Sequence, residues 1–105
     1  MPECDELAAF LIMEIAVNDP EVYAAYRQAV SANLAAAGGT HLIRGGAVEV
    51  LEGDWRPNRK FVVRFDSAED TRQWWNSPDH TELKAMRQRS AKTNMILVEG
   101  VSGAL

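Results

Sequence analysis

Two histidines and an arginine are the side chains of this sequence best suited to chemistry on a small organic molecule. His41 and His80 are its only histidines, and imidazole exchanges protons near neutral pH. Arg44 follows three residues after His41, and a guanidinium can hold a carboxylate or an enolate through two hydrogen bonds. We therefore predict His41 and His80 as candidate catalytic residues and Arg44 as the main substrate-binding residue.

The elements that position these residues follow from the apolar pattern and the turn-forming residues. Strands are expected where apolar runs are bounded by turn formers, at 10–17, 40–50, 60–66 and 95–101. A helix is expected at 20–37, because Asp19 can cap it, a proline follows the cap and a Gly-Gly pair ends it. A second helical region begins after Ser67 and restarts at a Ser-Pro pair, extending from 78 to about 92.

The order of these elements is β-α-β-β-α-β, which predicts a ferredoxin-like α+β sandwich. Right-handed crossovers then give a four-stranded antiparallel sheet with its helices on one face. We interpret residues 41–55 as the central strand and the hairpin of this sheet. A chain of 105 residues has the size of one domain, so we expect a single domain over 10–105 and a mobile N-terminal segment over 1–9.

Alternation along each strand separates the two faces of the sheet. Purely apolar sets, such as Ile96 with Val98, are assigned to the side of the helices. The same alternation places His41 on the face opposite Arg44. The remaining sets carry one charge each, and these charges are Glu14, Arg44, Arg64 and Glu99.

The four strand charges have two interpretations, because charge on an otherwise apolar surface must be paired or hydrogen-bonded. In the first interpretation they line a small polar cleft. Arg44 binds an anion there, and the neighbouring substrate-binding groups are Glu14, Arg64 and Glu99. In the second interpretation the charges form structural ion pairs at the interface of a homodimer.

The helix-free face of the predicted sheet favours that homodimer. The strands are apolar on both faces, so the face without helices must also be covered. A second copy of the chain, packed sheet to sheet, would cover it.

Aromatic residues complete the candidate site. Trp74 and Trp75 are adjacent on a predicted helix, where successive side chains point about 100° apart, so one enters the core and the other lines a rim. We predict Trp75 as an apolar wall of the site. Tyr23 and Tyr26 share a helix face, where core packing is expected. His80 has the alternative of lying in solvent near the start of the last helix.

Composition excludes several classes of function. The net charge of −4 disfavours nucleic-acid binding, which requires a basic surface. The single cysteine, Cys4, is expected to be an inert surface thiol. No HxH or HExxH spacing indicates a metal, and no motif indicates a cofactor. The chain has no membrane-length apolar run and no signal-peptide pattern, so we expect a cytoplasmic protein without a membrane partner.

Three long motifs resemble one known family. RGGAVEVLEGDW, RPNRKFVVRFDS and WWNSPDHTELKAMRQRSAKTNMILVEG occur in this order, and the chain is similar in them to domain-of-unknown-function family thirteen-thirty, in the dimeric α/β-barrel superfamily. The resemblance spans about 10–101 and implies a ferredoxin-like fold that forms a dimeric α/β barrel by sheet-to-sheet packing. Members tend to have tyrosines where this chain has Trp75 and His80. The signature positions of the family fall here on Arg44, Gly45, Gly46, Glu52, Gly53, Ser77, Pro78 and Arg87.

Three functions are compatible with these residues. The first is a cofactor-free enzyme for a small organic acid or ring-containing metabolite, in which Arg44 binds the anionic group, His41 or His80 moves a proton and Trp75 forms an apolar wall. The second is a noncatalytic small-molecule binding protein that uses the same cleft. The third is a haem-binding relative with one of the two histidines as axial ligand.

Overall fold

In the computed structural model, residues 7–101 are described, and they form four strands and three helices. The elements are β1 Ala9–Val17, α1 Pro20–Ala36, β2 Thr40–Arg44, β3 Arg59–Phe65, α2 Ala68–Trp75, α3 Pro78–Ser90 and β4 Ala91–Glu99. Cys4 and most of the predicted N-terminal segment lie outside the described residues.

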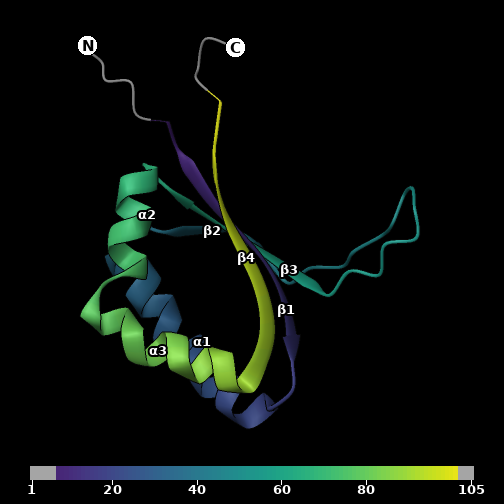
Figure 1. The fold of residues 1–105 in the computed structure, drawn as a ribbon, viewed down its shortest axis with the longest axis horizontal. Helices are drawn as coiled ribbons and strands as arrows, with labels where there is room; N and C mark the ends of the chain where they lie inside the picture. The colour runs from purple at the N-terminus through teal and green to yellow at the C-terminus, as the bar shows by residue number, and fades with distance from the viewer. Residues whose placement is uncertain (1–6, 102–105) are drawn as a thin grey trace.

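The strands form one antiparallel sheet in the order β2-β3-β1-β4. The helices lie on one face of this sheet, to the left of the strands in Figure 1. This arrangement confirms the predicted ferredoxin-like α+β sandwich. The central position predicted for residues 41–55 is wrong, because β2 is an edge strand and the centre is occupied by β3 and β1.

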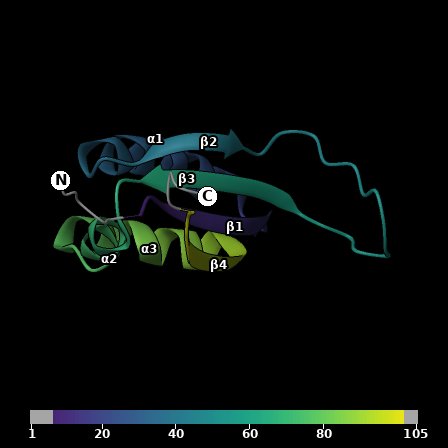
Figure 2. The ribbon, with the colours of Figure 1, turned by 90° about the horizontal axis from the view of Figure 1, so that it is seen from above.

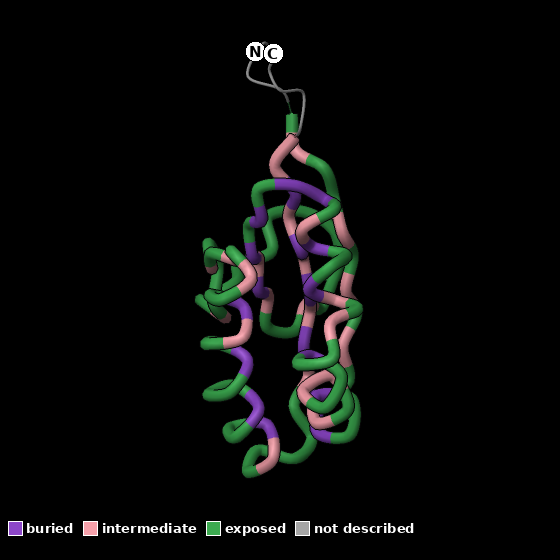
Figure 3. The backbone as a smooth tube through the Cα atoms, turned by 90° about the vertical axis from the view of Figure 1, so that its left-hand side faces the viewer, coloured by how far each residue is buried: buried purple, intermediate pink, exposed green. Residues whose placement is uncertain are grey.

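The hydrophobic core lies between the sheet and the helices, where Figure 3 shows the buried stretches of both layers. β1 buries every second residue from Ala9 to Ile15. The stripe that α1 buries against it consists of Tyr23, Tyr26, Val30 and Leu34. Tyr23 and Tyr26 are each 5% exposed and their ring centres are 5.5 Å apart, so the core position predicted for this pair is confirmed.

The starts of the helices follow two of the three predicted caps. Asp19 and Ser67 each accept a hydrogen bond from a backbone N–H of the first helical turn. Ser77 makes no such bond before α3. Its hydroxyl instead donates to the carbonyl of Trp74 at 2.9 Å, which ties the start of α3 to the end of α2.

β2 ends at Arg44 and not at residue 50, which corrects the predicted strand. Gly45 has a φ of 70°, in the left-handed region that glycine adopts readily, and its N–H donates to the carbonyl of Lys60 at 2.8 Å. The chain then leaves the sheet without forming further strand. Residues 45–58, which we call the arm, reach away from the helices in Figures 1 and 2.

A bulge in the pairing of β2 with β3 corrects the predicted faces of β2. His41 pairs with Val63 and Arg44 pairs with Phe61, so β2 has one more residue between the two pairs than β3 has. Val63 and Phe61 both point into the core. His41 and Arg44 therefore share the helix side of the sheet, and the prediction that they lie on opposite faces is wrong.

The faces predicted for β4 are also reversed. Leu97 is in register with core residue Leu11, whereas Ile96 is in register with Ile12 on the helix-free side. Both sets of β4 are largely apolar, so alternation alone did not distinguish them. We call the helix-free side the open face, and its exposed or half-buried apolar residues include Phe10, Ile12, Ile43, Val62, Ile96 and Val98.

Candidate functional site

A groove runs along the β4 edge of the molecule, between that strand and helices α2 and α3. Its apolar half has a volume of about 190 Å³ and is lined by Leu11, Thr71, Arg72, Trp75, Met95, Ile96 and Leu97. Its wider, polar half has a volume of about 430 Å³ and is lined by Trp75, Arg87, Gln88, Ala91, Lys92, Thr93 and Met95. Trp75 and Met95 belong to both halves, so we describe them together as the β4 groove.

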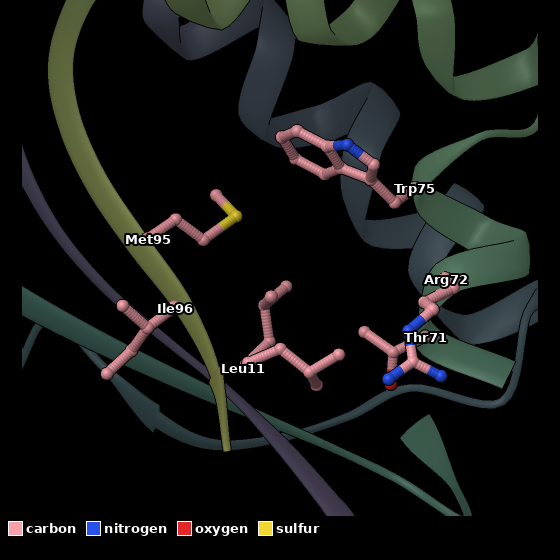
Figure 4. Close-up of a pocket in the computed structure, with 7 residues that line it drawn as sticks. Leu11, Thr71, Arg72, Trp75, Met95 and Ile96 are labelled. Carbon is pink, nitrogen blue, oxygen red and sulfur yellow. The ribbon is translucent and has the colours of Figure 1, made fainter. Parts of the chain in front are cut away.

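Trp75 forms the wall between the two halves. Figure 4 shows its ring, the side chain of Met95 and the side chain of Leu11 pointing into one shared space. The adjacent Trp74 is buried in the core, and its indole N–H donates to the side chain of Asn33 at 2.7 Å. One ring in the core and one at a rim is the predicted division, and the structure confirms it.

Arg87 supplies the buried positive charge of the polar half. Its side chain comes from α3, is only 4% exposed and has its guanidinium carbon 5.9 Å from the centre of the Trp75 ring. Within residues 7–101 its Nε has no hydrogen-bond partner, and neither has the buried hydroxyl of Thr93 in the same half. The guanidinium of Arg87 also interacts with the hydroxyl of Tyr26, but its Nε and its buried charge still lack an acidic partner in the described residues, and a buried charge of this kind favours an anion in this half.

His80 is buried behind the Trp75 ring and lines neither half of the groove. It is 0% exposed, and its ring centre is 4.0 Å from that of Trp74 and 5.5 Å from that of Trp75. Its Nδ1 is 3.3 Å from the backbone carbonyl oxygen of Trp75. Because a carbonyl oxygen only accepts hydrogen bonds, this contact assigns the ring proton to Nδ1 and a free lone pair to Nε2. The solvent position considered for His80 is therefore wrong.

The protonation of His80 follows from its surroundings. Burial is the main cause that lowers its pKa, and the charges of Lys84 and Arg87 act in the same direction, against the hydrogen bond to Trp75. His80 is therefore neutral near pH 7. Its Nε2 is buried and has no partner among residues 7–101.

His41 and Arg44 form a second polar cluster at the opposite edge, on β2. The Nη2 of Arg44 is 3.3 Å from the Nδ1 of His41, and both residues line a hollow of about 50 Å³ beside α1. Burial, with a smaller effect of the Arg44 charge, lowers the pKa of His41. This hollow is far smaller than the ~150 Å³ cavity that accommodates benzene, so it has room for a small ion and not for a ring.

The other predicted charges lie away from both places. Glu14 and Arg64 are on the open face. There Glu14 forms an ion pair with Lys60 at 2.6 Å, and Arg64 forms one with Asp66 at 3.0 Å. The hydrogen bond from Lys60 lowers the pKa of Glu14. Glu99 is exposed at the end of β4, on the helix side of its register. The four predicted charges therefore do not share one face, and none of the other three pairs with Arg44.

The structure thus divides the predicted site between two edges of the sheet. Trp75 lines the β4 groove with His80 buried behind its ring, and His41 and Arg44 meet at β2. Arg87 was indicated only as a signature position of the similar family. No group of three His, Cys, Asp or Glu side chains within residues 7–101 is placed to hold a metal ion. No helix in this range has the length and hydropathy that crossing a membrane requires.

Several solved structures share this fold. A protein of unknown function from Rhodopseudomonas palustris is 18% identical, with a TM-score of 0.75 over 93% of this chain and 85% of its own. A dimeric ferredoxin-like protein of unknown function from Thermobifida fusca is 17% identical, with a TM-score of 0.62 over 95% and 97%. SnoaB, a cofactor-independent oxygenase from Streptomyces nogalater, is 11% identical, with a TM-score of 0.65 over 91% and 95%. These low identities show a common fold alone.

A comparison with curated proteins gave no match. A family model does match, and it covers residues 8–101, nearly the whole chain. The name of that family assigns no activity. The chain belongs to the family described as Domain of unknown function (DUF1330).

Proposed function

We propose that the protein binds a small, ring-containing organic acid in the β4 groove. The ring would occupy the apolar half, between Trp75 and Met95, and the carboxylate would contact Arg87. The observation that carries this proposal is the guanidinium of Arg87, which is 4% exposed, lines the groove and has an unpartnered Nε within the described residues.

The size and lining of the apolar half favour a ring. An apolar cavity of ~150 Å³ accommodates benzene, and this half has about 190 Å³. Leu11, Met95 and Leu97 offer it no polar side chain, and Trp75 offers an aromatic surface for stacking. The ammonium of Lys84, 3.9 Å from the centre of that ring, helps to hold it in place.

The polar half favours a negative charge on the same ligand. A carboxylate beside Arg87 would satisfy the unpartnered nitrogen and neutralise a buried charge. Hydrogen bonds between ionised groups contribute about 1.5–3 kcal/mol. In this proposal the ring and the acid belong to one molecule, which extends past Trp75 from the apolar half into the polar half.

A cofactor-free reaction on the same acid is the second candidate, and His80 favours it. The residue is neutral and has an unpartnered Nε2, which is the form that accepts a proton. SnoaB, described as a cofactor-independent oxygenase, shares the fold. A rate that requires His80 while ligand affinity does not would separate this candidate from simple binding.

Haem binding has the least support of the three functions considered. His80 is enclosed by the two tryptophan rings, and His41 adjoins a hollow of about 50 Å³. A porphyrin needs far more space than the structure leaves beside the imidazole of either histidine within residues 7–101.

We also propose that the protein is a homodimer paired through its open faces. Ile96 is 58% exposed there, Val98 is exposed on the same strand, and Ile43 is exposed on β2 at the other edge of this face. Covering apolar surface stabilises an assembly by about 25 cal/mol for each Å². The dimeric protein from Thermobifida fusca, which has the same fold, supports this arrangement.

Substitution of Arg87 tests the ligand site. Benzoate is the probe and benzamide is its uncharged counterpart, with binding followed by tryptophan fluorescence and by thermal shift. We expect Arg87→Gln to weaken benzoate binding about tenfold or more, because the lost charged hydrogen bonds contribute ~1.5–3 kcal/mol and 1.4 kcal/mol is tenfold. Benzamide binding should change little.

The matched control is Arg89→Gln, which removes an exposed arginine from the same helix and should leave benzoate binding unchanged. Urea unfolding of each variant establishes that it is folded at the assay temperature. Equal benzoate affinity in Arg87→Gln and the wild type would contradict the proposal, as would the absence of saturable binding by any aromatic acid.

A further inference from the structure

The arm is an exposed segment whose composition does not suit solvent. Leu51 is 90% exposed and Trp55 is 63% exposed, and Val48 and Val50 are exposed with them. Residues 47–55 also contain three acidic side chains, at 49, 52 and 54, and no basic one. A projection that is both apolar and acidic is typical of a segment that docks on another surface.

The base of the arm is fixed to the centre of the sheet. The carboxylate of Glu14, on β1, accepts a hydrogen bond from the backbone N–H of Asn58 at 2.8 Å and another from Lys60 at 2.6 Å. The ammonium of Lys60 also lies 4.7 Å from the centre of the Trp55 ring. The returning limb of the arm is therefore held beside the open face, and Figure 1 shows the arm projecting on the side away from the helices.

The β4 groove has the complementary composition. Its apolar half exposes Ile96 at the mouth, and its rim carries the cations of Arg72 and Lys92. The arm of the same chain leaves from β2, at the opposite edge of the sheet from β4, and projects away from the helices that form the other side of the groove. The apolar and acidic surface of the arm is thus complementary to the apolar and basic surface of the β4 groove. Within one chain the arm does not reach that groove.

We propose that the arm of a second copy of this chain lies across the mouth of the β4 groove and completes the site. The inference rests on the proposed pairing of open faces. Paired sheets are ~10 Å apart, and the eight steps along an extended chain from Gly45 to the turn at Gly53 span at most about 26–29 Å. The arm is therefore long enough to pass the sheet of the partner and reach its helix layer.

Two symmetric arrangements of the sheets have different consequences. A two-fold axis parallel to the strands places β2 of one copy beside β4 of the other, so each arm meets a groove. An axis across the strands places β2 beside β2, so the two arms meet each other. The complementary charges favour the first arrangement, because two acidic arms repel.

Cysteine cross-linking distinguishes these arrangements. In a Cys4→Ser background, which has no native thiol, chains with Leu51→Cys at the arm are mixed with chains that carry Arg72→Cys or Gln88→Cys at the groove rim. The control partner is Gln28→Cys, an exposed position on α1. After mild oxidation, disulfide-linked mixed dimers are measured on non-reducing gels. We expect at least ten times more product with a rim cysteine than with the control.

The result that overturns the inference is equal product with rim and control cysteines, or product formed mainly between two Leu51→Cys chains. Sedimentation velocity of the wild-type chain separates this outcome from failure of the dimer itself. If the chain is a dimer but no disulfide forms between residue 51 and the groove rim, the proposed position of the arm is wrong and the pairing of open faces still stands. A monomer at micromolar concentration removes both.

Discussion

His80 and Arg87 are polar residues on the inner side of α3, where an apolar stripe would be expected. Helical spacing in the sequence predicts one stripe with Leu83, Met86 and Ser90. In the structure Ser90 is buried and Leu83 and Met86 are half-buried, while His80 and Arg87 are buried as well. Periodicity therefore located the helix and Ser90, and it did not identify the buried histidine and arginine.

The buried imidazole predicts a loss of stability in mild acid. Burial lowers the pKa of folded His80 below 6.5, so the unfolded chain binds this proton more readily than the folded chain does. Stability from this group is complete above about pH 6.5 and is lost as the pH falls through the folded pKa. The slope for one group approaches about 1.4 kcal/mol per pH unit.

Urea unfolding between pH 7.5 and 5 checks this prediction. As the pH is lowered, the free energy of unfolding should decrease less steeply in His80→Gln than in the wild type. His41→Gln is the comparison, because His41 is only half-buried and its removal should flatten the profile less. Parallel profiles for the wild type and His80→Gln would show that the buried ring does not titrate with folding.

The edge strand β2 shows what a sequence pattern misses at the scale of an element. The Gly-Gly pair at 45–46 directly follows the end of β2, yet the apolar residues after it led to a predicted strand that continued to residue 50. The bulge left no trace in the alternation of apolar residues, because it depends on how β3 pairs with β2. His41 and Arg44 therefore came together where the period-two rule had separated them.

The two glycines after β2 have different roles and provide a matched pair of variants. Gly45 has a φ of 70°, and an added Cβ would lie 3.2 Å from the ring of Phe61. Gly46 has neither a positive φ nor any atom within 4 Å of an added Cβ. We expect Gly45→Ala to lower the free energy of unfolding by about 1–2 kcal/mol and Gly46→Ala to change it by less than about 0.5 kcal/mol. Urea denaturation at pH 7.5 measures both, and equal effects would argue against a conformational requirement at Gly45.

For the whole molecule, the order of elements and the layering followed from the caps, the turn formers and the handedness of crossovers. The same reasoning left one face of the sheet uncovered, and the structure shows that open face. The location of the groove could not be predicted, because it depends on the face of β4 that meets Trp75. The side chains on both faces of β4 are largely apolar, so the sequence gives no basis for deciding which face packs against Trp75.

Ile12, at the middle of β1 on the open face, tests whether that face pairs with a second copy. A lysine there would be buried in a paired sheet and solvated in a single chain, so Ile12→Lys should shift the protein toward monomer by at least tenfold in Kd. Ala24→Lys, an exposed position on α1, should leave the assembly unchanged. Sedimentation equilibrium over a range of concentrations gives both constants, and an unchanged Kd for Ile12→Lys would place the contact elsewhere.

The two bonds that the Glu14 carboxylate makes with Asn58 and Lys60 also bear on how fast two chains would associate. These hydrogen bonds restrict the direction of the arm already in the single chain. The arm is therefore ordered when the chain folds, and it does not have to become ordered when two chains meet. Preorganisation of this kind reduces the ordering entropy that association must overcome. The middle of a central strand would in this way govern the kinetics of a contact made at the far tip of the molecule.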